Sequence, residues 1–122
     1  MKRIGRKKKN CVGQLKTDDG MTIAELSSKE IQNWLFYTVG RAKNRTEKTF
    51  IQLQDWTDTR SISHQHAEIS YDQNSGLFIF KNLGRNGSTV NDISLGKEAS
   101  QPLTNNSIIT IGGYKMKFVY NQ

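Results

Sequence analysis

Short apolar stretches separated by turn residues recur along most of the chain. In many of them apolar and polar residues alternate, as in residues 67–71 (AEISY), which is the period of a strand with one buried face. No stretch longer than about ten residues carries the period of a helix. The strands that we predict are residues 12–16, part of 21–29, 31–39, 50–53, 67–71, 77–83, 88–90, 94–95, 101–103, 108–111 and 114–120. Short strands with a turn signal roughly every 8 to 12 residues predict an all-β domain, a sandwich of two packed antiparallel or mixed sheets.

The positive charge is concentrated at one end of the sequence. The net charge is +7, and six of the eighteen Lys and Arg residues stand in the first nine positions. Residues 1–10 show no apolar period, and we expect them to form a basic flexible arm ahead of one domain at residues 11–122. The arm is typical of a nuclear localisation signal, of a nucleic-acid contact through residues 2–9, or only of a solubilising tail. The remaining 12 cations and 11 anions nearly balance, so we do not expect the body to bind polyanions in general.

Composition also limits the cellular compartment and the kinds of disulfide, metal site and membrane segment that we expect. The single cysteine, Cys11, excludes an internal disulfide and a zinc site built from several thiolates. No apolar run approaches the roughly 18 residues that a membrane span needs. The basic N-terminus lacks the apolar segment of a secretory signal. We therefore expect an intracellular protein, in the nucleus or the cytoplasm.

Three polar clusters stand where predicted strands begin or end. They are Gly40-Arg41, residues 61–66 (SISHQH) and residues 84–87 (GRNG). Because strand ends can meet at one edge of a sheet, we expect these clusters to come together. They offer guanidinium, hydroxyl, imidazole and amide groups and no acid, which suits an anion. The sequence therefore predicts an anion-binding site made by loops at one end of the sandwich.

Each cluster also has an ordinary interpretation when it is taken alone. Arg41 can be a surface arginine that ends a strand, and Ser63 a loop hydroxyl that caps a neighbouring amide. Asn86-Gly87 is a strong signal for a tight hairpin turn. Only the occurrence of all three clusters in one order favours a common site.

Metal binding and catalysis are less well supported by the same residues. His64 and His66 lack a third ligand nearby in sequence, so we expect no metal. A Ser63–His66 nucleophile, oriented by Asp55 or Asp58, is conceivable, but no oxyanion motif accompanies it. We expect no catalytic residue and no cofactor.

The order and spacing of these motifs resemble those of the forkhead-associated (FHA) domain, from about Cys11 to Tyr120. The resemblance is carried by Gly40-Arg41, by Ser63-x-x-His66 followed by Ala67-x-Ile69, by Asn86-Gly87 with Val90-Asn91, and by Ile108-x-x-Ile111-Gly112. It implies a β-sandwich that binds phosphothreonine peptides with the loops at one end.

The resemblance also implies roles for individual residues. It implies that the phosphate is bound by Arg41, Ser63, His64 and Arg85. It also implies that Asn86 binds the main chain of the peptide. According to the resemblance, the loops are shaped by Gly40, His66, Gly87 and Asn91.

Two of the departures from the family pattern lie within the polar clusters. His64 stands where the family often has Arg or Asn, and Gly84 stands where it commonly has Ser. These departures leave open a phospho-independent FHA interaction domain.

The favoured hypothesis is a non-catalytic module that docks a larger protein onto phosphothreonine-containing partners. Arg60, Arg85 and the basic loop Lys43–Lys48 suggest a preference for acidic residues C-terminal to the phosphothreonine. The alternative is a basic β-domain that binds nucleic acid through the N-terminal arm and the same loop.

Overall fold

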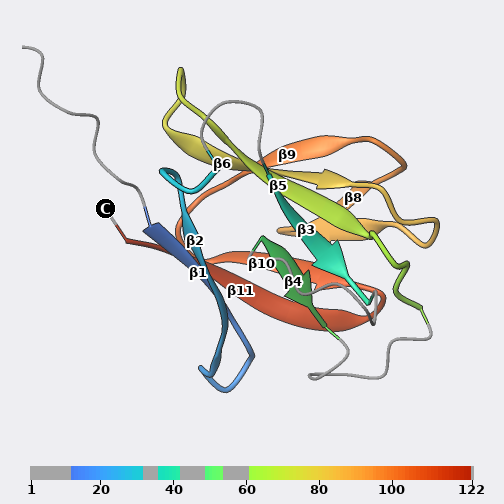
Figure 1. Ribbon diagram of the computed structural model, residues 1–122. Coiled ribbons are helices and arrows are strands. Elements are labelled where there is room, and N and C mark those ends of the chain that lie inside the picture. Colours follow the sequence, from blue (N-terminus) through green and yellow to red (C-terminus); the bar gives the residue numbers. More distant parts are fainter. Residues whose placement is uncertain (1–11, 32–35, 42–48, 54–60, 122) are drawn as a thin grey trace, which may run out of the picture.

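Two packed β-sheets form the molecule in the computed structural model, which describes residues 12–31, 36–41, 49–53 and 61–121 (Figure 1). The strands are β1 (Val12–Lys16), β2 (Thr22–Ser27), β3 (Tyr37–Gly40), β4 (Phe50–Gln52), β5 (Ala67–Asp72), β6 (Leu77–Asn82), β7 (Ser88–Val90), β8 (Ile93–Leu95), β9 (Ser100–Leu103), β10 (Ser107–Ile111) and β11 (Tyr114–Asn121). Nothing in these ranges is a helix long and apolar enough to cross a membrane. The all-β sandwich predicted from the sequence is confirmed.

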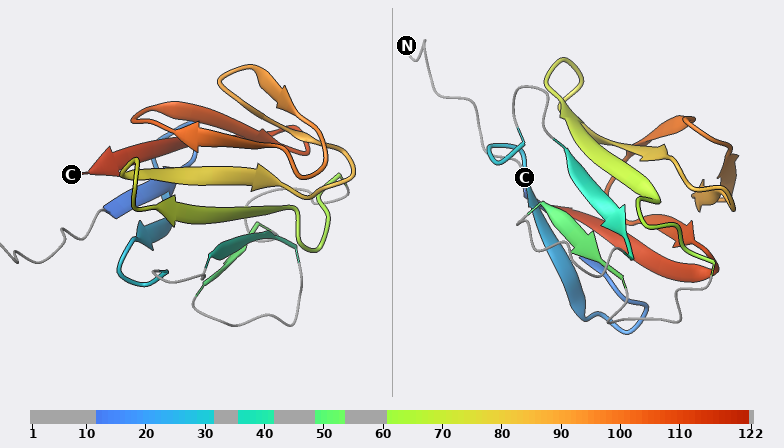
Figure 2. Two further views of the ribbon diagram at one scale, coloured as in Figure 1. Left: turned by 90° about the horizontal axis from the view of Figure 1, so that it is seen from above. Right: turned by 45° about the vertical axis from the view of Figure 1, so that its right-hand side comes forward.

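One sheet has six strands and the other has five (Figure 2). The six-stranded sheet has the order β2-β1-β11-β10-β7-β8, and the five-stranded sheet has the order β4-β3-β5-β6-β9. The pair β3–β4 is parallel, whereas the other pairs between neighbouring strands are antiparallel. The chain crosses from the five-stranded to the six-stranded sheet after β6, and this crossing carries one of the polar clusters.

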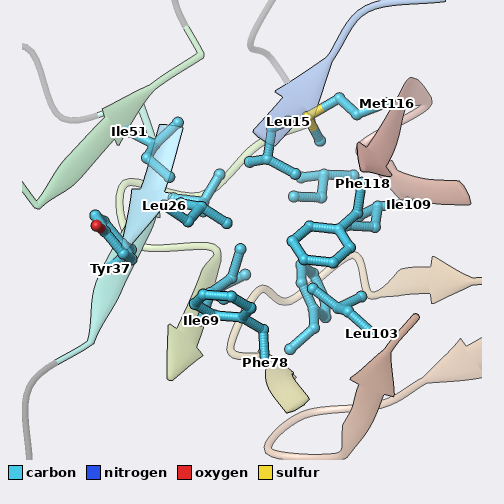
Figure 3. Close-up of a cluster of buried hydrophobic side chains, with 14 of the residues drawn as sticks. Leu15, Leu26, Tyr37, Ile51, Ile69, Phe78, Leu103, Ile109, Met116 and Phe118 are labelled. Carbon is cyan, nitrogen blue, oxygen red and sulfur yellow. The ribbon is translucent and has the colours of Figure 1, made fainter. Parts of the chain in front are cut away.

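The core lies between the two sheets and follows the alternation seen in the sequence. In β6 the residues Phe78 and Phe80 are fully buried, and in β11 Phe118 is fully buried (Figure 3). The rings of Phe78 and Phe118 meet edge to face across the sandwich, with their centroids 5.7 Å apart. Burying a side chain of this size contributes about 1.5–3 kcal/mol. This packing fixes the spacing of the sheets and therefore the position of the loops at their ends.

One predicted strand is shorter than its apolar run. The run 31–39 was expected to be a single strand, but β3 begins at Tyr37, and Ile31 lies buried in the turn after β2. The Tyr37 hydroxyl accepts a hydrogen bond from the backbone N–H of Ser27 at 2.8 Å and donates one to the Glu30 carboxylate. Because a buried turn and a buried strand are equally apolar, the pattern of residues alone does not separate them.

Candidate functional site

The end of β3 lies against the loop at residues 61–66. The backbone N–H of Arg41 donates a hydrogen bond to the carbonyl oxygen of His64 at 3.2 Å. The Nε–H group of Arg41 donates to the carbonyl oxygen of Ile62. These bonds place the Arg41 guanidinium on the loop that carries Ser63, and they use one of its five N–H donors.

Gly40 allows this close approach of strand and loop. A Cβ atom at residue 40 would overlap the carbonyl oxygen of His64, which is backbone and has little freedom to move. The backbone N–H of Leu53, just after β4, donates to the Gly40 carbonyl oxygen at 2.8 Å. Gly40 is thus held between the loop on one side and the β4 edge on the other.

His66 joins the loop at residues 61–66 to the turn at residues 84–87. Its side chain has 0 % exposure. The ring Nδ1 accepts a hydrogen bond from the backbone N–H of Ser63 at 3.0 Å, and Nε2–H donates to the carbonyl oxygen of Gly87 at 2.9 Å. This pair of partners fixes the neutral tautomer with the proton on Nε2.

The burial of His66 makes stability depend on pH. Burial lowers the pKa of His66 from 6.5, against the opposing effect of the bond to Gly87. The unfolded chain therefore takes up a proton near pH 6.5, whereas the folded chain resists it until the pH is lower. We expect the contribution of His66 to the free energy of unfolding to be complete above pH 6.5 and to decline as the pH falls below it. Between pH 8 and pH 5, the slope of the melting temperature against pH should be smaller in His66→Gln than in wild type.

His64→Gln is the matched control, because His64 is exposed and belongs to the same loop. It should keep the wild-type slope. An equal slope in wild type and His66→Gln would contradict the expectation.

Gly84 makes room for this histidine. A Cβ atom at residue 84 would overlap the His66 ring. The backbone N–H groups of Leu83 and Gly84 both donate to the His66 carbonyl oxygen, at 2.8 and 2.9 Å. The departure from the family pattern at residue 84 therefore has a packing reason, since a serine there would displace the ring.

Asn86 connects the third polar cluster to the second. Its Nδ2 group donates to the carbonyl oxygen of Ser61 at 3.1 Å, and the side chain is exposed. The turn contains Gly87 with a φ of 76°, which a residue with a side chain rarely adopts. The turn joins β6 to β7, which belong to different sheets, so Asn86-Gly87 does not form a tight hairpin turn here.

The structure thus brings together the clusters that contain Arg41, Ser63 and Asn86. His64 is exposed on the same loop as Ser63, and Arg85 is exposed in the same turn as Asn86. The loop at residues 61–66, in light green, reaches the end of the molecule where the turn after β6 lies (Figure 2).

Asn91 lies away from these loops, at the opposite end of β7 from Gly87. Its Oδ1 accepts a hydrogen bond from the backbone N–H of Ile108 at 2.9 Å, and its Nδ2 donates to the Ser107 hydroxyl at 3.2 Å. Its backbone has a φ of 52°. Asn91 therefore fixes the β7–β8 turn on β10, and its contacts do not reach the loops around Arg41.

Asn82, which the sequence interpretation did not single out, anchors the turn at residues 84–87. It has 0 % exposure, and its Nδ2 lies within 3.1–3.3 Å of the carbonyl oxygens of Gly84, Leu95 and Gly96. Its Oδ1 accepts hydrogen bonds from the backbone N–H of Gly84 and from the Ser88 hydroxyl. The signal in the sequence was an amide at a core-facing position of an alternating strand, after Phe78 and Phe80.

A shallow groove of about 480 Å³ runs beside Asn86. Small, uncharged residues make up its lining: Ser61, Asn86, Gly87, Ser88, Thr89, Ser94, Leu95, Thr110, Gly112 and Gly113. A Cβ atom at Gly112 would lie 2.8 Å from the Ser61 carbonyl oxygen, so the β10–β11 turn packs against the loop at residues 61–66. Through Ser61 and Asn86 the groove reaches the second and third polar clusters.

Neither ring nitrogen of His66 is available to a metal or to the Ser63 hydroxyl, because each already has a backbone partner. Within the described ranges no three His, Cys, Asp or Glu side chains form a possible metal site. Several predicted features lie outside these ranges: the N-terminal arm at residues 1–10, the loop Lys43–Lys48, Asp55, Asp58 and Arg60.

The family model of the FHA domain matches residues 37–112. The chain belongs to the FHA domain family. The matched segment runs from the first residue of β3 to the β10–β11 turn and so contains Arg41, Ser63 and Asn86. The FHA resemblance expected from the sequence is confirmed.

Two curated relatives of this FHA domain are much longer proteins. The domain is 32% identical over 106 residues to the pre-rRNA-processing protein FHL1 of Saccharomyces cerevisiae. It is 30% identical over 105 residues to the fork-head transcriptional regulator FHL1 of Candida albicans. Each alignment covers 80% of this chain, but only 11% and 9% of the two relatives. The chain spans about a tenth of their length.

Solved FHA domains share the fold. The FHA domain of CT664 from Chlamydia trachomatis superposes with a TM-score of 0.65 at 21% identity, covering 93% of this chain and 100% of that one. A MEK1 FHA domain, solved in complex with a HOP1 phosphothreonine peptide, superposes with a TM-score of 0.63 at 19% identity, covering 90% and 97%. At these identities the likeness establishes the sandwich and its strand order.

Proposed function

We propose that this FHA domain binds phosphothreonine-containing segments of partner proteins and carries out no catalysis. Arg41, Ser63, His64 and Arg85 would surround the phosphate, and Asn86 would hold the main chain of the peptide. The observation that carries the proposal is the junction at Ser61–His64, where Arg41 is bonded to the backbone from one side and Asn86 from the other.

The donors at this junction suit a phosphate monoester. A phosphothreonine carries about −1.5 to −2 charges at pH 7 and presents three strong acceptor oxygens. The planar guanidinium of Arg41 can meet two of these oxygens at once, which an ammonium group cannot do in the same geometry. The hydroxyl of Ser63 adds a donor without adding charge repulsion.

Two further considerations support a protein ligand. A structural neighbour of this chain, the MEK1 FHA domain, was solved with a phosphothreonine peptide. The groove beside Asn86 is open and lined by small polar residues, which is a form that an extended peptide can occupy.

The proposal predicts an ordered set of affinities for one peptide in three forms. The phosphothreonine peptide should bind at least about hundredfold tighter than the unphosphorylated one, since a charge-assisted hydrogen bond contributes about 1.5–3 kcal/mol and two or more are available. The phosphoserine form should bind about fourfold more weakly than phosphothreonine, the value of one buried methyl group. A degenerate phosphothreonine library identifies the sequence that binds best. Titration calorimetry with that sequence measures the affinities of its phosphothreonine, phosphoserine and unphosphorylated forms.

A chain that lacks residues 1–10 is the control for electrostatic binding of the peptide by the basic arm. Its phosphothreonine affinity should equal that of the full chain. Equal affinity for phosphorylated and unphosphorylated peptide would overturn the proposal in favour of a phospho-independent interaction domain.

A further inference from the structure

The outer face of the six-stranded sheet carries a row of hydroxyl groups that begins in the groove beside Asn86. Ser94 of β8 stands opposite Thr89 of β7, and Thr89 stands opposite Thr110 of β10. All three residues line the groove. A ladder of short polar side chains therefore leads from the proposed peptide site onto the sheet.

Lysines continue this row on the next strands. Thr110 stands opposite Lys115 of β11, and Lys117, two residues further along β11, stands opposite Lys16 of β1. Figure 1 shows β10, β11 and β1 next to one another. The alternate residues Leu15 and Met116 are buried, so the lysines belong to the outer face.

The register gives Lys16 and Lys117 no acidic partner directly across the strands. Lys117 stands between Ile108 and Lys16, and Lys16 stands between Lys117 and Thr22. The Nζ of Lys16 donates to the Thr22 hydroxyl at 3.3 Å. Like charges directly opposite each other on a sheet are unfavourable. The arrangement becomes favourable when an anion lies over the pair.

We propose that Lys16, Lys115 and Lys117 bind acidic residues of the same partner segment that carries the phosphothreonine. The inference rests on the proposed function and adds a second contact surface to it. The groove and the hydroxyl row join the two surfaces without an intervening charge. Asp18 and Asp19, in the β1–β2 turn, line a hollow together with Lys115 and partly offset its charge, so Lys16 and Lys117 carry most of the attraction.

Strand spacing sets the position of the acidic residues. From β7 to β1 there are three strand-to-strand steps of about 4.8 Å each, or about 14 Å. An extended peptide covers about 3.3 Å per residue, so the acidic residues would stand about four residues beyond the peptide residue over β7, and about five from a phosphothreonine next to that residue. Three lysines are fewer than the roughly 6 to 10 phosphate contacts typical of nucleic-acid binding, and this favours a peptide.

Peptides with a displaced acidic tract test the proposal. They share one phosphothreonine core and carry a short glutamate tract, or a matched glutamine tract, beginning about five residues away on the N-terminal or the C-terminal side. At low salt, one of the two glutamate peptides should bind about tenfold tighter than its glutamine counterpart, as the sum of three exposed ion pairs. The gain should disappear at high salt.

Substitution of the lysines assigns that gain to the surface. In the triple variant K16Q/K115Q/K117Q the glutamate and glutamine peptides should bind equally, with the wild-type affinity for the glutamine peptide. Lys81→Gln is the matched control, because Lys81 lies on the outer side of β6 in the other sheet. It should keep the tenfold gain.

The outcomes are separable. The proposed function fails if the glutamine phosphopeptide does not bind, and this inference then fails with it. If that peptide binds but neither glutamate peptide gains, or the gain survives the triple variant, the inference alone is overturned. A single-stranded oligonucleotide gives a further test. The inference is overturned if the oligonucleotide binds wild type and the triple substitution weakens that binding by a larger factor than the factor by which the glutamate tract tightens peptide binding.

A measurement of the melting temperature checks that the triple variant is folded. Because removal of like charges that face each other is not destabilising, its melting temperature should equal or exceed that of wild type. Lys117→Glu, which places a carboxylate opposite Lys16, should raise the melting temperature by about 2 °C and abolish the gain. A lower melting temperature in Lys117→Glu would show that the two side chains do not face each other.

Discussion

Arg41→Ala is expected to reduce the affinity for a phosphothreonine peptide at least about hundredfold, because the guanidinium can supply two charge-assisted hydrogen bonds of about 1.5–3 kcal/mol each. The same change removes the bond from Arg41 Nε to the carbonyl oxygen of Ile62. That bond is half-buried, and its loss should cost about 1 kcal/mol of unfolding free energy. Titration calorimetry measures the affinity, and denaturant unfolding measures the stability.

Arg41→Lys separates charge from geometry. It keeps the positive charge but lacks the planar fork, so its affinity should lie between those of wild type and Arg41→Ala. A value equal to that of Arg41→Ala would show that the bidentate geometry is essential. Binding by Arg41→Ala as tight as that of wild type would remove Arg41 from the phosphate site.

Asn82→Ala is expected to have the largest effect on stability, about 3–4 kcal/mol. The side chain is fully buried and satisfies three carbonyl oxygens, one backbone N–H and the Ser88 hydroxyl. Alanine would remove all of these hydrogen bonds from the protein interior, and the loss of several buried hydrogen bonds at one point is costly. Urea unfolding monitored by circular dichroism gives the difference in unfolding free energy.

Asn74→Ala is the matched control, since Asn74 lies exposed in the β5–β6 turn. It should change the unfolding free energy by less than about 0.5 kcal/mol. In Asn82→Ala the phosphopeptide affinity should fall as well, because the turn that carries Arg85 and Asn86 loses its anchor. A stability loss below about 1 kcal/mol would contradict the role assigned to Asn82.

The sequence predicted most of the strands and the meeting of the polar clusters, because both depend on local signals. The β5–β6 hairpin has alternating strands and a turn that ends in Gly76, with a φ of 71°. The meeting of Gly40-Arg41 with the loop at residues 61–66 followed from their positions at strand ends. In each case the signal is a short run of neighbouring residues at a strand or at its end.

The remaining features depend on partners that are distant in the chain. The overlap that a side chain at Gly84 would cause arises from the ring of His66, and neither residue reveals it alone. The anchoring by Asn82 depends on the carbonyl oxygens of Leu95 and Gly96, which come from the next hairpin. The row of lysines depends on the register of β1 with β11, which pairs the first and last strands of the domain.

The parallel pairing of β3 with β4 has a consequence for the connection between them. Thr38 stands opposite Phe50, and Gly40 stands opposite Gln52, so both strands run in the same direction. After Gly40 the chain must therefore return over the full length of the strand before β4 can begin, which a tight turn cannot achieve. Deletions that shortened this connection below that length would therefore detach β4 from the sheet, and homologues should preserve a minimum length there.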